Sequence, residues 1–352
     1  MTGGGISIND IFRFSNGGIV SGRDKLCISS SNTLKSLQDF KDNIKRFMDL
    51  NIEQARLEFE LGVDTRDWKI EYAQKELKDT NNKDENYINI LYRPFDVRWT
   101  YFTGKSKGFH CMPKGNIMQH MLNNDNLGLI YYRSCENKEI NNFFITQNTI
   151  DFHLVGSGSI ISPLYLKIQN ENIENFTPDF RAFINTKYDD DFSPEDILGY
   201  IYAILYHKDY RSSFKDFLKM DYPKIIFIDS KDDFIKLSEL GSKLINIHLL
   251  KNINTPKDIG QPFFKNISNK NEKIDKILYD EDERALYIND SLYFANVTKK
   301  ILEYKIGGYE VLYKYLKSHK NENIAYNHFE NIIKALYATI NIQDQIAQIK
   351  IL

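Results

Sequence analysis

Cysteine is scarce in this chain of 352 residues, and its three cysteines, Cys27, Cys111 and Cys135, lie far apart. Their odd number and the lack of a Cys-x-x-Cys pair argue against a disulfide framework and against a zinc site. No apolar run approaches the roughly eighteen residues of a membrane span. The first residues, Met-Thr-Gly-Gly-Gly, have no basic flank followed by an apolar core. The sequence therefore predicts a cytoplasmic protein without a membrane partner.

Catalytic signatures are also missing. The chain has no Gly-x-x-x-x-Gly-Lys-Ser/Thr, no Gly-x-Ser-x-Gly and no His-Glu-x-x-His. It also lacks the Asn/Asp-Pro-Pro-Tyr/Phe motif of amino-methyltransferases and a glycine-rich turn for S-adenosylmethionine. Its seven histidines are scattered, and neither His110 nor His248 has an activating partner adjacent in the sequence. We therefore expect no catalysis by this chain alone, and no cofactor or metal of its own.

Charge is unevenly distributed along the chain, although the formal net charge is only −2. Residues 93–142 carry seven lysines and arginines against four acids, whereas residues 171–196 carry two against eight. The first section could therefore face phosphate groups, while the second could not.

Hydrophobic periodicity predicts an α+β fold in four consecutive segments, of which the first two are a junction and a strand-rich section. Residues 1–80 are expected to hold a strand pair around the turn Asn16-Gly17-Gly18 and then a helical connector from Thr33 to Lys78. Residues 81–170 alternate with the two-residue period of strands. Strands are expected at Tyr87–Tyr92, Val97–Phe102, Leu127–Arg133, Phe143–Thr146 and Ile160–Ile168, with one short helix at Asn116–Leu122.

The last two segments are predicted to be a helical frame, residues 171–255, and an α/β subdomain, residues 256–352. Ser193-Pro194-Glu195-Asp196 is typical of a capped helix start, and Ser230 with Asp233 caps a later helix through Leu249. The other elements expected are a helix around 210–218, a strand at Ile225–Ile228, a hairpin of Ile274–Tyr279 with Ala285–Ile288, and helices at Tyr309–Lys317 and His328–Gln348.

The stretch from Tyr92 to Phe102 concentrates arginine and aromatic residues about a quarter of the way along the chain. Pro94 favours a turn that enters a strand, after which one side of the strand packs and the other presents cations. Two interpretations stay open. Arg93 and Arg98 contact DNA, or their stems cover apolar surface and an arginine pairs with Asp96.

The residue types of the strand-rich section match those that bind DNA directly. In the short helix, Gln119 and His120 are expected opposite an apolar side made by Ile117, Met118 and Met121. Lysine and arginine suit phosphate and guanine, and asparagine and glutamine suit adenine. An A+T-biased coding sequence would produce the same asparagine-rich loops. The candidate DNA contacts are Arg93, Arg98, Lys105, Lys107, Lys114, Gln119, Arg133, Asn137, Lys138, Asn141 and Asn142.

A series of short motifs also carries a family resemblance. The motifs are Tyr92-Arg93-Pro94-Phe95-Asp96-x-Arg98-Trp99, Ser162-Pro163-Leu164-Tyr165-Leu166, Phe217-Leu218-Lys219-x-Asp221-Tyr222-Pro223 and Ile306-Gly307-Gly308-Tyr309. In this order the chain resembles, from about Ile6 to Gln348, the C-terminal specificity domain of type ISP restriction–modification enzymes. Where that family commonly has Arg-Pro-Arg, this chain has Met112-Pro113-Lys114, so only Lys114 stays as a candidate there.

The resemblance implies that the chain recognises double-stranded DNA and that other domains do the chemistry. In that family one polypeptide joins a nuclease, an ATP-driven translocase and an adenine N6-methyltransferase to this region. Those domains, in cis or in trans, would use S-adenosylmethionine, ATP and Mg²⁺. Gly18 to Asp24 resembles the junction with the methyltransferase domain.

Two other functions are compatible with the sequence. The acidic section Asp179–Asp196 and the C-terminal helices could dock onto a partner enzyme without reading DNA. Asp189, Asp190 and Asp191 could hold a metal for nuclease chemistry, although consecutive carboxylates rarely converge on one cation. The glycines of Ile306-Gly307-Gly308-Tyr309 could offer amides to a phosphate if a helix began there.

Overall fold

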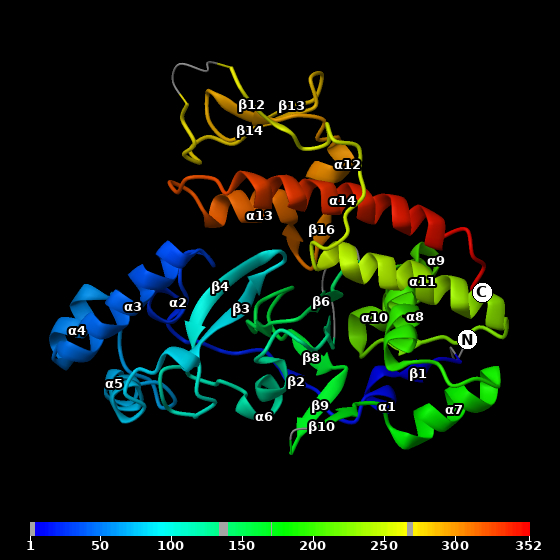
Figure 1. The fold of residues 1–352 in the computed structure, drawn as a ribbon, viewed down its shortest axis with the longest axis horizontal. Helices are drawn as coiled ribbons and strands as arrows, with labels where there is room; N and C mark the ends of the chain where they lie inside the picture. Colours follow the sequence, from blue (N-terminus) through cyan, green and yellow to red (C-terminus); the bar gives the residue numbers. More distant parts are fainter. Residues whose placement is uncertain (1–3, 134–139, 170, 266–269) are drawn as a thin grey trace. The chain divides into compact units, whose positions relative to one another are not determined.

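The computed structural model describes residues 4–133, 140–169, 171–265 and 270–352 (Figure 1). The chain forms two compact units, each assembled from segments that are not adjacent in the sequence. The first unit consists of residues 1–13, 132–145 and 176–352, and the second of residues 14–131 and 146–175. Helices and several small sheets together confirm the α+β class. The division into four consecutive segments stays a prediction.

The second unit contains the predicted helical connector and most of the strand-rich section. Its helices are α2 (Asp24–Cys27), α3 (Leu34–Asp49), α4 (Ile52–Glu58), α5 (Ile70–Asp79) and α6 (Gly115–Met118), with 3₁₀ turns η1 (Asp84–Asn86) and η2 (Gln119–Met121). Its strands are β2 (Asn16–Gly17), β3 (Tyr87–Arg93), β4 (Asp96–Tyr101), β5 (Gly128–Tyr131), β7 (Thr149–Ile150), β8 (Ile160–Pro163), β9 (Tyr165–Ile168) and β10 (Glu171–Glu174). Strand β6 (Phe144–Thr146) lies where the chain passes from one unit to the other.

The β3–β4 hairpin confirms the strands predicted from alternation. Its register pairs Arg93 with Asp96, so Pro94 and Phe95 form a two-residue turn, and Phe95 has a φ of 63°. Strand β3 also pairs in parallel with β7, which the sequence did not predict. The hairpin is therefore covered on both sides: Tyr101 and Thr100 point to opposite faces of β4 and are both fully buried.

The predicted strand pair near the N-terminus is wrong. Strand β1 (Ile6–Ser7) pairs with β11 (Lys224–Ile225) in the first unit, while β2 pairs with β8 in the second. The glycines do not form a tight turn there. A Cβ on Gly18 would lie 2.6 Å from the backbone of Asp151, so this glycine allows two backbones to approach closely.

The short helix at 115–121 differs from the prediction at one residue. Gln119 is exposed as expected, but His120 is only 5% exposed. Its Nδ1 accepts a hydrogen bond from the backbone N–H of Lys167 at 3.0 Å, and burial lowers its pKa. His120 is therefore part of the packing, and the prediction that it faces solvent or a ligand is wrong.

The first unit is mainly helical and confirms the two helix starts predicted at Ser193 and Ser230. Its helices are α1 (Ile8–Ile11), α7 (Pro178–Tyr188), α8 (Pro194–Tyr206), α9 (Lys208–Ser213), α10 (Lys215–Met220), α11 (Lys231–His248), α12 (Lys299–Leu302), α13 (Val311–Ser318) and α14 (Tyr326–Ile346). Ser193 and Asp196 form a capping box at α8, and Ser230 caps α11. Helix α8 packs on α11 with the rings of Tyr200 and Phe234 stacked 4.4 Å apart.

A four-stranded antiparallel sheet lies beside α13 and α14 in the first unit (Figure 1). Its order is β12 (Pro262–Phe264), β15 (Leu292–Phe294), β14 (Ala285–Tyr287) and β13 (Leu278–Asp280). The predicted β13–β14 hairpin is confirmed, and Phe294 packs on Phe329 of α14 with ring centroids 4.8 Å apart. Gly307 and Gly308 form the turn between β16 (Lys305–Ile306) and β17 (Tyr309–Glu310), so the helix start expected there is wrong.

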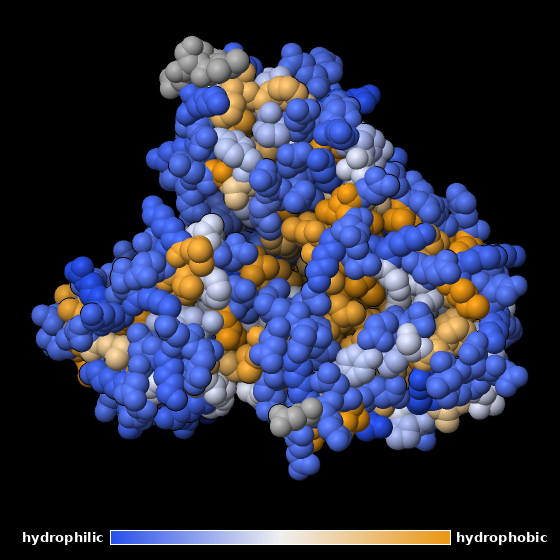
Figure 2. All heavy atoms as spheres, in the orientation of Figure 1, coloured by the Kyte–Doolittle hydropathy of each residue, from blue (hydrophilic) through white to orange (hydrophobic). Residues whose placement is uncertain are grey.

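Hydrophilic side chains cover most of the face drawn in Figure 2. Among the helices of the described ranges, none is long and apolar enough to cross a membrane.

One histidine in each unit is buried in its neutral form. Thr100 donates its only hydroxyl proton to the carbonyl oxygen of Cys27, so His110 Nε2–H must donate to Thr100 Oγ1, 2.7 Å away. Thr339 likewise donates its hydroxyl proton to the Ala335 carbonyl, so His248 Nε2–H donates to Thr339 Oγ1. The Nδ1 of His248 accepts a hydrogen bond from the hydroxyl of Tyr202 at 2.6 Å. Burial lowers the pKa of His110 to about 4 and that of His248 to about 3.

We expect acid to destabilise both units as the pH falls from 6.5 towards about 4. The folded pKa values lie below the unfolded value of 6.5, so the unfolded chain binds more protons than the folded chain in this window. The free energy of unfolding is therefore at its full value above pH 6.5 and declines as the pH falls. For His110 the loss approaches about 3 kcal/mol at pH ~4. Urea unfolding at about pH 7 and 4.5 measures it. A free energy of unfolding that does not change between these pH values would contradict the assignment.

Candidate nucleic-acid interface

The Lys105 loop, residues 103–114 of the second unit, presents two of the exposed residues among the predicted DNA contacts. It follows β4 and precedes α6, and the side chains of Lys105, Ser106 and Lys107 are all exposed. Lys105 lies 3.9 Å from Asp79, a loose pair, and Lys107 forms no salt bridge in the described part of the chain, although its charge acts on Asp67. Two cations are thus available at the tip of the loop.

Two glycines close the base of the Lys105 loop. A Cβ on Gly115 would lie 2.7 Å from the carbonyl oxygen of Gly104, so the backbones at the two ends are in direct contact. Gly104 also has a φ of 78°, which favours glycine. Lys114, next to this contact, has a φ of 54° and precedes α6.

Glu76 of α5 anchors the Lys105 loop through its carboxylate. Its carboxylate is buried and accepts hydrogen bonds from the Thr103 hydroxyl and from the backbone N–H of Phe109. A Cβ on Gly108 would overlap this carboxylate, so glycine at this position lets the loop backbone approach Glu76 closely. On the other side, Trp68 Nε1 donates to the Phe109 carbonyl at 2.9 Å. The loop is therefore anchored around 108–109, which leaves its lysines to project outward.

An amide-lined concavity of about 450 Å³ adjoins the base of the Lys105 loop. The side chains of Asn86, Asn116, Gln119 and Asn123 line it together with Glu85 and Thr103. Asn86 donates to the Tyr101 hydroxyl at 2.9 Å, and Gln119 Nε2 donates to the Asn116 carbonyl at 3.1 Å, which orients both amides. The second unit thus brings Gln119 beside the base of the Lys105 loop, in a setting rich in donors and acceptors.

Arg93 and Arg98 have internal partners. Arg93 Nη1 lies 2.8 Å from Asp151 Oδ1, and Arg98 Nη2 lies 2.7 Å from Asp96 Oδ2, with each arginine side chain 11% exposed. Both guanidinium groups also lie over the ring of Tyr92, at 3.9 and 4.4 Å. These contacts favour the interpretation in which the arginines brace the hairpin.

The other predicted contacts that the structure describes belong to the first unit. Arg133 belongs to the first unit, where it is exposed and lies 5.7 Å from the ring of Tyr222. Asn141 and Asn142 are buried in the first unit, at 7% and 4% exposure. Asn137 and Lys138 fall outside the described residues.

Two aspartates of the acidic section Asp179–Asp196 form ion pairs. Asp190 lies 2.9 Å from Lys231, and Asp191 lies 2.9 Å from Arg181. In the ranges that the structure describes, no group of three or more histidine, cysteine or acidic side chains could hold a metal. The docking function stays a prediction.

Comparison with known proteins decides the family. The model of the type ISP C-terminal specificity domain matches residues 10–345. The chain belongs to this family. The resemblance inferred from the sequence motifs is thereby confirmed over nearly the whole chain.

Solved structures share the fold of this specificity domain. A cryo-EM structure of a DrdV–DNA complex aligns with a TM-score of 0.72 at 17% identity and covers 100% of this chain and 39% of that one. The type ISP enzyme LlaBIII bound to DNA gives 0.69 at 18%, covering 97% and 24%. A nuclease-deletion mutant of LlaGI with a DNA substrate mimic gives 0.65 at 18%, covering 97% and 33%. No match was found among proteins of curated function.

The specificity domain therefore spans well under half of the length of these enzymes.

Sequence reasoning missed Glu76 as an anchor of the Lys105 loop. Its spacing held a signal, because Glu76 lies three residues after Ala73 on the apolar side of α5, where a carboxylate needs a partner.

Proposed function

We propose that this chain recognises a specific double-stranded DNA sequence on behalf of a restriction–modification enzyme. Membership of the type ISP specificity-domain family over residues 10–345 carries the proposal. The DNA present in all three similar structures supports it. An exposed lysine loop beside an amide-lined concavity is the combination that phosphate contact and base-edge contact require.

The geometry supports different roles for the predicted residues. Lys105 and Lys107, exposed on an anchored loop, would contact phosphates, and Lys114 would extend this surface. Gln119, exposed at the concavity, would contact base edges. Arg93 and Arg98 would hold the hairpin that leads into the loop, because their guanidinium groups are paired with buried carboxylates. Contacts from Arg133, Asn137, Lys138, Asn141 and Asn142 stay proposals without such support.

Methylation and cleavage would be done by other domains, in the same polypeptide or in a partner. This chain corresponds to 39% or less of each similar enzyme. S-adenosylmethionine, ATP and Mg²⁺ would act in those other domains, and this chain would direct them to a site.

Selection from random duplexes tests the proposal. The purified chain is incubated at low salt with a pool of duplexes, bound DNA is recovered over several rounds, and the pool is sequenced. We expect one asymmetric motif to be enriched, and Gln119→Ala to relax the preference at one or two positions, since a lost bidentate contact costs about 1–3 kcal/mol of discrimination. A folded protein that enriches no motif would refute sequence recognition.

A further inference from the structure

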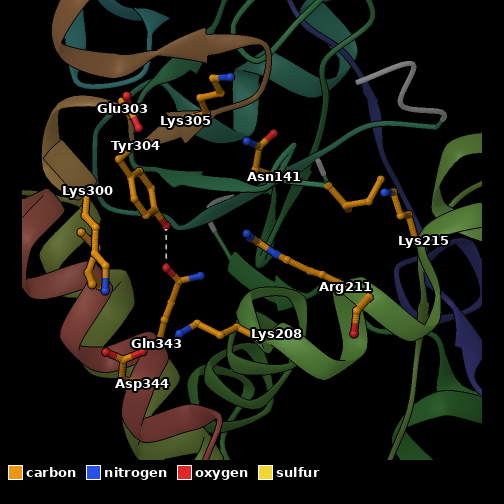
Figure 3. Close-up of a pocket in the computed structure, with 13 residues that line it drawn as sticks. Asn141, Lys208, Arg211, Lys215, Lys300, Glu303, Tyr304, Lys305, Gln343 and Asp344 are labelled. Carbon is orange, nitrogen blue, oxygen red and sulfur yellow. Dashed lines mark hydrogen bonds and ion pairs between the residues drawn. The ribbon is translucent and has the colours of Figure 1, made fainter. Parts of the chain in front are cut away.

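A second concave site, in the first unit, is lined by an excess of positive charge (Figure 3). Its volume is about 630 Å³, within the range of small-molecule sites. Side chains from α9, α10, α12, β16 and α14 surround it, together with Asn141. The charged residues that line it are Lys208, Arg211, Lys215, Lys300, Lys305, Glu303 and Asp344.

Four of the five cations, Arg211 and three lysines, form no ion pair with a carboxylate in the described part of the chain. Lys208 pairs with Asp344, but no ion pair is formed by Lys215, Lys300 or Lys305, and all three are exposed. These lysines come from α10, α12 and β16, so they approach the pocket from different elements. Their amino groups lie on different sides of the pocket (Figure 3), and this excess of cations around one pocket favours an anionic ligand.

Two polar atoms at this pocket are buried without a hydrogen-bond partner among the residues that the structure describes. One is a donor, Arg211 Nη2, and the other is an acceptor, Asn141 Oδ1. Leaving such a buried atom unpaired typically costs about 1–3 kcal/mol of stability, so each atom is expected to form a hydrogen bond with a ligand group.

Both groups are held in place by their surroundings. Arg211 Nε donates to the Leu205 carbonyl at 2.6 Å, and its guanidinium lies 4.3 Å from the centre of the Tyr206 ring. Asn141 is 7% exposed, and its backbone carbonyl oxygen accepts a hydrogen bond from the Gly307 N–H at 2.8 Å. The turn between β16 and β17 therefore fixes Asn141, and α9 fixes Arg211.

The remaining polar groups of the pocket floor are already satisfied. The Tyr304 hydroxyl donates to Gln343 Oε1 at 2.8 Å, the bond drawn in Figure 3, and Gln343 Nε2 donates to the Tyr206 carbonyl at 3.3 Å. The groups open to a ligand are thus Arg211, Asn141 and the three lysines.

We propose that this pocket binds a nucleotide unit. Phosphate oxygens only accept hydrogen bonds, so they suit Arg211 and the lysines but not Asn141 Oδ1. The ligand therefore needs a donor on the same molecule, which a ribose or deoxyribose hydroxyl or a base amino group supplies. A free nucleotide and a nucleotide of a DNA strand share this chemistry. The site lies in the unit that does not contain the Lys105 loop, so the inference goes beyond the proposed function.

Titration calorimetry on the whole chain tests the assignment with three probes: ADP, inorganic phosphate and a short DNA oligonucleotide. Lys215→Ala/Lys300→Ala changes exposed side chains and should leave folding intact, which thermal unfolding verifies. Asn141→Leu removes the acceptor. Lys236→Ala/Lys243→Ala, on exposed positions of α11, makes the same change in charge and serves as the control.

We expect the Lys215/Lys300 variant to bind at least about tenfold more weakly, the loss of roughly 1.4 kcal/mol, while the α11 control is unchanged. If ADP is the probe affected, the site takes free nucleotides. If only the oligonucleotide is affected, the site takes a nucleotide of a DNA strand. In either case Asn141→Leu should weaken that probe and leave phosphate binding as it was.

Two results would overturn the assignment. One is that the Lys215/Lys300 variant binds both ADP and the oligonucleotide as the unchanged chain does. The other is that phosphate binds as tightly as either nucleotide probe. Neither bears on sequence recognition, which the duplex selection tests separately.

Discussion

Replacing Lys105 and Lys107 together by alanine is expected to weaken duplex binding roughly 60-fold at about 0.1 M salt. Each phosphate contact contributes about 0.9 decade of affinity per decade of salt, so two contacts account for nearly two decades between 1 M and 0.1 M. The slope of log affinity against log salt should fall by about two units. Folding should be unaffected, because both side chains are exposed and neither has a close ion pair in the described part of the chain.

The measurement is fluorescence anisotropy with a labelled duplex across a salt series. Lys35→Ala/Lys45→Ala is the matched control, since both residues are exposed on α3 of the same unit and the change in charge is equal. General electrostatics would make the two double variants equally weak. The Lys105 loop is not the DNA contact if its variant retains the salt slope of the unchanged chain.

Local signals in the sequence predicted much of the fold. Ser193 and Asp196 are three residues apart and cap α8 by themselves, so their pattern needs no tertiary information. The β3–β4 hairpin follows from alternation around one proline. These elements depend on neighbours in the chain, which is why propensity and spacing were sufficient.

Features that depend on distant partners could not be predicted in this way. Gly18 resembles a turn residue, but its role is set by the backbone of Asp151. Arg93 resembles a DNA contact until Asp151, 58 residues away, is placed beside it. The same holds at the candidate site: the lysines were found from charge and residue type, whereas their anchor, Glu76, becomes evident only when α5 is packed under the loop.

The contact between α8 and α11 illustrates such a distant constraint and leads to a large expected effect of one substitution on stability. A Cβ on Gly241 of α11 would overlap the carbonyl oxygen of Gly199 on α8, and a Cβ on Gly199 would lie 2.5 Å from the Ser238 carbonyl. The obstacles are backbone atoms of buried helices, so no side-chain movement relieves them. Gly241→Ala must push the helices apart and loosen the stacked Tyr200 and Phe234 rings.

We expect Gly241→Ala to lower the free energy of unfolding by about 3 kcal/mol or more, with a fall of about 10 °C in Tm. Circular dichroism reports the helices of both units, with most helical residues in the first, while the two tryptophans, Trp68 and Trp99, both lie in the second unit. The dichroism transition should therefore move to lower temperature at least as far as the tryptophan fluorescence does. Glu239→Ala, at an exposed position of α11, is the control and should change Tm little. A Gly241→Ala protein with the Tm of this control would mean that the helices tolerate a wider separation, and the close packing of Gly199 on Gly241 would not be what stabilises the first unit.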